Sequence, residues 1–424
     1  MRILILVAIS FVPAYAGSAP LYAAPVQGIA LVQTVDFEDT EELRGALLGA
    51  EQLGIRSRDE IAAALADEGI PGVPQYGVVL YRVLYKTVDH EGMLREASGA
   101  VAIPLTLDGP APLLSYQHGS VSARRRVPSA QGFDLVSMGL SGSGYVTALP
   151  DYLGLGASDT FHPYVHAATL GTSVVDFLRA TRLLCAQLDI PLSEQLFLVG
   201  YSEGGYATMA AHREIEAHHT DEFTVTASAP MAGPYNLSDV MVEQMLEDKP
   251  YPTPGYLPFT LVSYDRVYDL FDDLSDVLRE PYANAVDSLF NGNYALREIN
   301  EHLPSVPRDM LTDNFVAALR EKTHPLQKAL AENDVHNWAP VAPMRLFHCV
   351  DDDQVSFRNA EKALAAFQAH GADHVELAAL EFGGHESCAP PALFLGKLWL
   401  DGFRAGQQAP MLQANIKIIK SGTF

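Results

Sequence analysis

A serine flanked by glycines two residues away on each side is the clearest chemical feature of this chain. The pentad Gly200-Tyr-Ser202-Glu-Gly204 follows the apolar run 195–199 and precedes a helix-compatible run at 206–215. A G-x-S-x-G sequence between a strand and a helix places the serine on a sharp turn, with its hydroxyl above the sheet edge. Ser202 is therefore a candidate nucleophile. The alternative, a serine in an ordinary glycine-rich turn, does not explain the flanking strand and helix patterns.

A serine nucleophile needs a general base and a carboxylate that orients the base, and candidates for both follow later in the chain. An acidic trio, residues 351–353, follows the apolar run 344–350, and His385 stands after two glycines in the loop predicted after the last strand. The spacing Asp-x-x-Val, which ends here at Val355, selects Asp352 as the acid. The order Ser202, Asp352, His385 is that of the catalytic triad in α/β-hydrolases.

Three adjacent carboxylates also raise the alternative of a calcium site. A calcium-binding EF-hand loop needs acidic residues at alternate positions and a glycine at the sixth, whereas the sixth position counted from Asp351 is Ser356. The sequence therefore predicts no metal site and no cofactor.

Acyl transfer by a serine also requires hydrogen-bond donors for the developing oxyanion. One expected donor is the backbone N–H of Glu203, the residue after the nucleophile. The other is expected from the loop after the strand 111–117, where the amides of Gly119 and Ser120 are both candidates. His118 in this loop is interpreted as a structural hydrogen-bonding residue, and the side chain of Glu203 has no role that the sequence assigns.

The spacing of apolar residues predicts the elements that position these groups. Residues 36–70 are rich in Glu, Ala and Leu with helical spacing, and runs at 77–85 and 97–104 suggest an antiparallel strand pair. From residue 113 onward apolar strands alternate with helices, which indicates parallel α/β layering. The predicted elements are strands at 111–117, 144–149, 195–200, 223–230, 344–350 and 374–382, and helices at 167–188, 203–217, 357–370 and 390–404.

This alternation stops between residues 236 and 340, a proline-rich stretch with short amphipathic helical pieces. We therefore predict the α/β-hydrolase fold, with a mostly parallel central sheet, helices on both faces and an inserted, mainly helical cap. The core comprises residues 17–235 and 341–424, and the cap residues 236–340. A cap over the carboxyl edge of the sheet would cover the ligand site of such a fold; the alternative is a purely structural excursion.

The N-terminus has the features of a secretory signal. Met1 and Arg2 precede an apolar stretch at 3–12, and Ala14-Tyr-Ala16 provides a cleavage site, so residues 1–16 are predicted to be removed. No other run is long and apolar enough for an integral membrane segment, and we expect a secreted or periplasmic protein. The net charge of −24 disfavours nucleic acid and anionic lipid surfaces as partners.

The chain has 3 cysteines, at positions 185, 349 and 388. Cys349 ends the strand before Asp352, and Cys388 lies three residues after His385. Neighbouring strands would bring these two cysteines within disulfide range, and export permits oxidation. The alternative of two separately buried thiols stays open.

Four motifs together resemble the secretory lipase family of lid-bearing α/β-hydrolases. They are Ser115-Tyr-Gln-His-Gly119, Pro150-Asp-Tyr-Leu-Gly-Leu-Gly156, His162-Pro-Tyr164 and Gly200-Tyr-Ser-Glu-Gly-Gly205. The resemblance covers roughly residues 75–405 and implies cofactor-free hydrolysis of a small-molecule or lipid ester by Ser202, Asp352 and His385. Fungal members take an oxyanion donor from an acidic residue in the loop where this chain has His118-Gly-Ser120, so that detail is not transferred.

Two other functions remain as alternatives. A serine peptidase or acylaminopeptidase can use the same fold, although no clear carboxylate pair for a peptide amino terminus is evident in the sequence. A non-catalytic hydrolase-fold binding protein is disfavoured by the complete set of triad residues. Acyl-chain length, natural substrate and oligomeric state are not specified by the sequence.

Overall fold

The computed structural model describes residues 29–30, 43–70, 73–406 and 416–419. The predicted signal peptide, residues 1–16, lies outside these residues. Among the helices described, none combines the length and apolar character needed to cross a bilayer.

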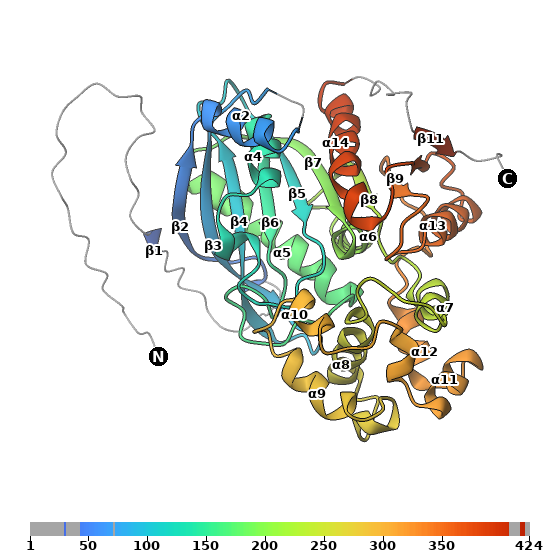
Figure 1. The fold of residues 1–424 in the computed structure, drawn as a ribbon. Helices are drawn as coiled ribbons and strands as arrows, with labels where there is room; N and C mark the ends of the chain where they lie inside the picture. Colours follow the sequence, from blue (N-terminus) through green and yellow to red (C-terminus); the bar gives the residue numbers. More distant parts are fainter. Residues whose placement is uncertain (1–28, 31–42, 71–72, 407–415, 420–424) are drawn as a thin grey trace.

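One mixed sheet forms the centre of the molecule (Figure 1). The strands from β6 to β10 in the spatial order β6-β5-β7-β8-β9-β10 are parallel, and the pairs outside this block are antiparallel. The full order is β1-β2-β3-β4-β6-β5-β7-β8-β9-β10-β11. The bounds are β1 Ile29–Ala30, β2 Leu47–Arg56, β3 Val78–Val88, β4 Leu94–Pro104, β5 Ala111–Gln117, β6 Val146–Pro150, β7 Leu192–Tyr201, β8 Val225–Met231, β9 Arg345–Cys349, β10 Glu376–Leu380 and β11 Ile416–Ile419.

Helices cover both faces of this sheet, as the alternating pattern predicts. One apolar cluster joins the sheet to α5, α6 and α13, and a second joins the opposite face to α2, α4 and α14. Successive strand residues point to opposite faces, so Leu113 belongs to the first cluster and Leu114 to the second. The bounds are α2 Arg58–Asp67, α3 Pro128–Gln131, α4 Leu135–Gly142, α5 Ala167–Gln187, α6 Glu203–His218, α13 Arg358–Ala369 and α14 His385–Arg404.

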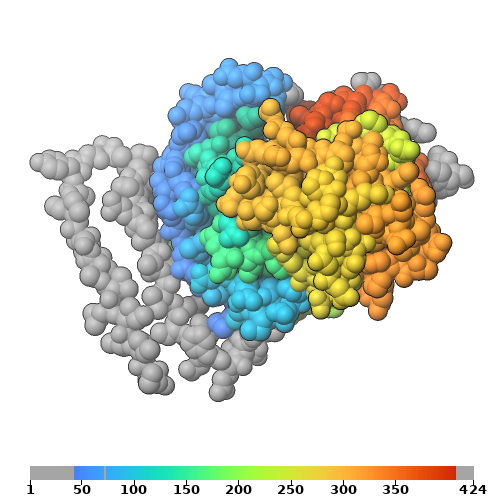
Figure 2. Space-filling view, turned by 60° about the horizontal axis from the view of Figure 1, so that its bottom comes forward, coloured from blue at the N-terminus to red at the C-terminus, as the bar shows by residue number. Residues whose placement is uncertain are grey.

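The stretch between β8 and β9 consists of short helices gathered at one end of the sheet (Figure 1). Figure 2 shows its surface, yellow to orange, lying over the green and blue core from that end. We refer to residues 236–340 as the helical segment. Its elements are η1 Leu237–Met241, α7 Val242–Met245, α8 Tyr256–Tyr268, η2 Leu274–Asp276, α9 Tyr282–Leu289, α10 Leu296–Asn300, η3 Pro307–Met310, α11 Asp313–Arg320 and α12 Pro325–Glu332.

The helical expectation for residues 36–70 is wrong over the stretch that forms β2. Within this range the α-helix that forms is α2, Arg58–Asp67. Leu47–Arg56 instead pairs antiparallel with β3. Glu, Ala and Leu favour helix only weakly, and pairing with an adjacent strand outweighs that preference.

Candidate active site

Ser202 lies on the turn between β7 and α6 with a backbone conformation that non-glycine residues rarely adopt. Its φ is 63° and its ψ is −128°, a conformation that costs on the order of 1–3 kcal/mol and persists only where the surroundings impose it. Two glycines make the turn sterically feasible. A Cβ at Gly204 would collide with the carbonyl oxygen of Gln117, and one at Gly205 with that of Met231. Small residues are thus required where α6 packs against β5 and β8.

His385 reaches the hydroxyl of this serine. Its Nε2 lies 2.9 Å from Ser202 Oγ. His385 is the first residue of α14, with Gly384 as the N-cap, so the base opens a helix that begins earlier than the predicted helix 390–404. Its backbone N–H donates to Asp353 Oδ1 at 2.8 Å, and the hydroxyl of Tyr201 donates to its carbonyl oxygen at 2.7 Å. These bonds fix the position of the imidazole.

Asp352 is the member of the acidic trio that contacts the histidine. Its Oδ2 lies 2.7 Å from His385 Nδ1, and its Oδ1 accepts backbone N–H bonds from Gln354 and Val355 at 3.0 and 2.8 Å. Burial acts to raise the pKa of Asp352, but hydrogen bonds from His348 and His385 outweigh it and hold the pKa well below its ordinary value. The group is therefore a carboxylate, the form that holds the imidazole in one tautomer.

The two neighbouring acids differ in their hydrogen bonds. The side chain of Asp351 is exposed, whereas that of Asp353 binds the backbone of His385 as described above. Both acids are exposed, as expected for loop residues outside the triad, and Asp353 in addition accepts a hydrogen bond at the start of α14.

His348 is a second histidine on Asp352 that the sequence pattern does not identify. It is fully buried on β9; its Nε2 lies 2.8 Å from the Val355 carbonyl oxygen and 3.3 Å from Asp352 Oδ2. Because a carbonyl oxygen can only accept, Nε2 carries the proton and donates to both oxygens. His348 Nδ1 has no hydrogen-bond partner among the described residues. His348 therefore contacts the same carboxylate oxygen, Oδ2, as His385.

Two of the candidate oxyanion donors, at Glu203 and Gly119, lie beside the nucleophile. Glu203 is the first residue of α6, where backbone N–H groups have no partner within the helix. A Cβ built on Gly119 would lie 3.6 Å from Ser202 Cβ, so the backbone at this position closely approaches the nucleophile. The Ser120 hydroxyl is 2.9 Å from the Tyr164 hydroxyl, and the His118 ring contacts the carbonyl oxygens of Gly119 and Asp151.

A disulfide joins the two segments that carry the acid and the base. Cys349 at the end of β9 is bonded to Cys388 in α14, with Cα atoms 6.1 Å apart. Asp352 and His385 each lie three residues from one of these cysteines. Cys185 is buried and is the free cysteine.

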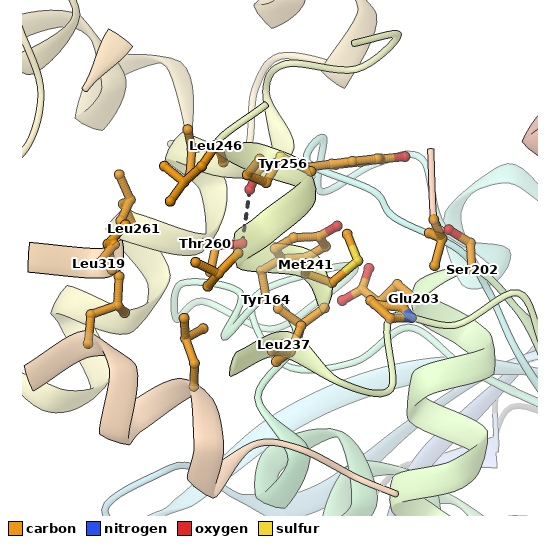
Figure 3. Close-up of a pocket in the computed structure, with 18 residues that line it drawn as sticks. Tyr164, Ser202, Glu203, Leu237, Met241, Leu246, Tyr256, Thr260, Leu261 and Leu319 are labelled. Atoms are coloured by element: carbon orange, nitrogen blue, oxygen red, sulfur yellow. Dashed lines mark hydrogen bonds between the residues drawn. The ribbon is translucent and has the colours of Figure 1, made fainter. Parts of the chain in front are cut away.

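A narrow apolar cavity of about 80 Å³ starts at Ser202 and runs beneath the helical segment (Figure 3). Ser202 and Glu203 are at one end, and aliphatic side chains from η1, α7, α8, α11 and α12 form most of the wall. These include Leu237, Met241, Met245, Leu261, Leu319 and Leu330. His385 is not among the residues that line the cavity. Among the described residues, no group of three His, Cys, Asp or Glu side chains is arranged to hold a metal ion.

Comparison with known proteins places this geometry in a family. The model of the secretory lipase family matches residues 129–407. The chain belongs to the secretory lipase family. The resemblance predicted from the four motifs is confirmed, and the protein is a carboxylic ester hydrolase.

Solved structures agree with this membership. The rice cell wall degrading esterase LipA from Xanthomonas oryzae is 33% identical, with a TM-score of 0.76 over 84% of this chain and 95% of LipA. A protein from Legionella pneumophila is 31% identical, with a TM-score of 0.77 over 86% and 99% of the two chains. Candida antarctica lipase A is 16% identical, with a TM-score of 0.67 over 87% and 84%, and shares the fold. The predicted α/β-hydrolase fold is confirmed. A search of curated proteins found no match.

Proposed function

We propose that this secretory lipase family member is an exported serine carboxylesterase that works through an acyl-enzyme. The observation that carries the proposal is the continuous hydrogen-bonded series Ser202–His385–Asp352 at the end of an apolar cavity. All three groups are buried, so the electrostatic interactions among them are weakly screened by water.

In the proposed reaction, His385 Nε2 takes the proton of Ser202 as Oγ attacks the ester carbonyl carbon. The backbone N–H of Glu203 and one from Gly119 or Ser120 bind the negative oxygen that develops. His385 then gives its proton to the leaving alcohol, and Asp352 stabilises the imidazolium in between. A water molecule then attacks the acyl carbonyl carbon while His385 Nε2 takes its proton, and the bond from that carbon to Ser202 Oγ breaks. His385 returns the proton to Oγ, and the carboxylic acid is released.

We place the acyl chain in the apolar cavity. The alcohol must leave on the side of His385, which supplies its proton, and His385 does not line the cavity. The cavity is lined instead at this end by Ser202 and Glu203, the residue whose backbone N–H is a proposed oxyanion donor. The helical segment supplies most of the aliphatic wall, so we assign it the role of a lid that selects the acyl group.

Export is supported by two separate features. Residues 1–16 have the composition of a signal peptide, and disulfides such as Cys349–Cys388 persist in oxidising compartments. The mature enzyme is thus proposed to act outside the cytoplasm, either in the periplasm or in the medium.

Hydrolysis of p-nitrophenyl esters of increasing acyl length, beside aminoacyl p-nitroanilides, tests this function. We expect turnover of the esters and little or none of the anilides. The opposite order would favour the peptidase alternative, and no turnover of either series would favour a non-catalytic binding protein. A fluorophosphonate probe should label the wild-type protein at Ser202, and peptide mapping by mass spectrometry would locate the adduct.

A further inference from the structure

The side chain of Glu203 is a buried carboxyl group at the mouth of the acyl cavity. The residue is 1% exposed, and its Oε1 lies 3.0 Å from His162 Nε2. Its other oxygen, Oε2, has no hydrogen-bond partner among the described residues. Figure 3 shows this carboxyl group between Ser202 and the side chains of Tyr164 and Met241. Nothing in the triad mechanism uses it.

The protonation of this pair follows from the hydrogen bonds of His162. Its Nδ1 lies 2.9 Å from the carbonyl oxygen of Leu153, which can only accept, so Nδ1 carries a proton. The contact between Nε2 and Glu203 Oε1 then needs one shared proton, because two lone pairs would repel each other. Whether that proton sits on nitrogen or oxygen, the pair has zero net charge. Glu203 Oε2 is a hydrogen-bond acceptor in both forms.

The other polar groups of the cavity wall already have partners. The Thr260 hydroxyl donates to the Tyr256 carbonyl oxygen at 2.9 Å, and the Tyr256 hydroxyl donates to Gln354 Oε1 at 3.1 Å. The Tyr164 hydroxyl is bonded to Ser120. A buried acceptor without a partner is unfavourable, and a ligand donor that pairs with it removes this cost on binding. Among the side-chain polar atoms of this wall, Glu203 Oε2 is thus the one without a hydrogen-bond partner in the described part of the chain.

We propose that Glu203 Oε2 binds a hydroxyl group at C2 or C3 of the acyl chain, so that hydroxyacyl esters are the preferred substrate class. This inference rests on the proposed function, which puts the acyl chain in this cavity. Glu203 is adjacent to the nucleophile, and three bonds separate its Cα from its carboxyl carbon, so its reach is restricted to the first carbons beyond the reacting carbonyl. A neutral hydroxyl fits better than an ammonium group, because the neutral His162–Glu203 pair would not compensate a buried positive charge.

The test compares three methyl esters of butanoic acid: the unsubstituted ester, the 2-hydroxy ester and the 3-hydroxy ester. Each kcat/KM of the full-length enzyme, measured by pH-stat, is divided by the alkaline hydrolysis rate of the same ester to remove intrinsic reactivity. We expect at least one hydroxy ester to exceed the unsubstituted ester by about tenfold, the factor expected for pairing a buried acceptor. Equal normalised values for all three esters would overturn the proposal.

Variants at Glu203 connect the preference to the carboxyl oxygen, and both retain the backbone N–H. Glu203→Leu should reduce the ratio of hydroxy ester to unsubstituted ester to about 1, since no acceptor remains. Glu203→Gln should keep the ratio, because the amide N–H can donate to His162 Nε2 while its oxygen faces the cavity. The matched control is Thr260→Val, which changes a cavity hydroxyl that is already bonded and should leave the ratio unchanged.

The outcomes separate this inference from the proposed function. A preference that survives in Glu203→Leu would overturn the role of Glu203 while leaving the esterase function intact. If no ester is hydrolysed, or if Ser202→Ala keeps the activity, the proposed function itself fails and the inference fails with it.

Discussion

The sheet core around Ser202 and the helical segment above it contribute to the site in different ways. In the core, hydrogen bonds fix individual atoms. The single carboxylate of Asp352, for example, accepts hydrogen bonds from His385 and from two backbone amides. In the helical segment, aliphatic side chains from five short helices contribute shape and volume. On the function proposed above, the core determines whether the reaction occurs, and the segment determines which acyl group enters. Substitutions in the two regions should have correspondingly different effects.

The largest effect is expected for Ser202→Ala in the core. Removal of the nucleophile from a triad lowers kcat by about 10⁶-fold, and the strained turn is retained because alanine has nearly the same volume. Stopped assays with p-nitrophenyl butanoate would measure the residual rate, and the thermal midpoint should stay near that of the wild type. Retention of more than a small fraction of the rate would refute the assignment of Ser202.

The acidic trio gives the next largest effect and a control within three residues. Asp352→Asn should lower kcat by about 10⁴-fold, because the amide no longer holds the imidazole in the required tautomer. Asp353→Asn leaves an oxygen that can accept the backbone N–H of His385, so a loss of less than about tenfold is expected. Asp351→Asn should have no effect, because this side chain is exposed. Comparable losses at positions 351 and 352 would contradict the assignment of the acid.

A substitution in the helical segment should change substrate preference instead of abolishing activity. Leu319→Trp adds volume to the cavity wall, so kcat/KM for p-nitrophenyl decanoate should fall by about tenfold while the value for the acetate stays nearly constant. Asn314→Trp places the same side chain on an exposed position of the same helix and should change neither value. The segment does not select acyl chains if Leu319→Trp lowers kcat/KM equally for both esters while its thermal midpoint stays at the wild-type value.

The smallest effect concerns the cysteine thiols of the core. In the native protein we expect no reaction between Cys185 and a thiol reagent. Burial raises the pKa of the Cys185 thiol to about 12, so almost no thiolate is present at pH 8 and the native protein should not react with a thiol reagent. After denaturation without reductant one thiol should titrate, and with reductant three should. Cys185→Ala should remove the single thiol. Three thiols in unreduced protein would show that Cys349 and Cys388 are not bonded.

The sequence predicts the parts of this site that depend on local motifs and chain order. Ser202 lies in a recognisable turn, and His385 and the acidic trio follow in the order that the fold requires. His348 and the His162–Glu203 pair could not be predicted, because the partners of Glu203 and Asp352 become visible only when strands and loops are placed in space. A separation of 39 residues between Cys349 and Cys388 likewise does not specify their distance. Over β2, the pairing with β3 outweighs a composition typical of helices.

The helical segment leaves β8 and returns in β9, and these two strands are neighbours in the sheet, with Met231 opposite Phe347. Its two attachment points are therefore side by side on a rigid scaffold. A segment with adjacent ends can be exchanged as one piece without lengthening or twisting the host chain. If the segment selects the acyl chain as proposed, recombination between relatives can transfer that preference in a single event, while the strands that lead to Ser202 and Asp352 remain as they are.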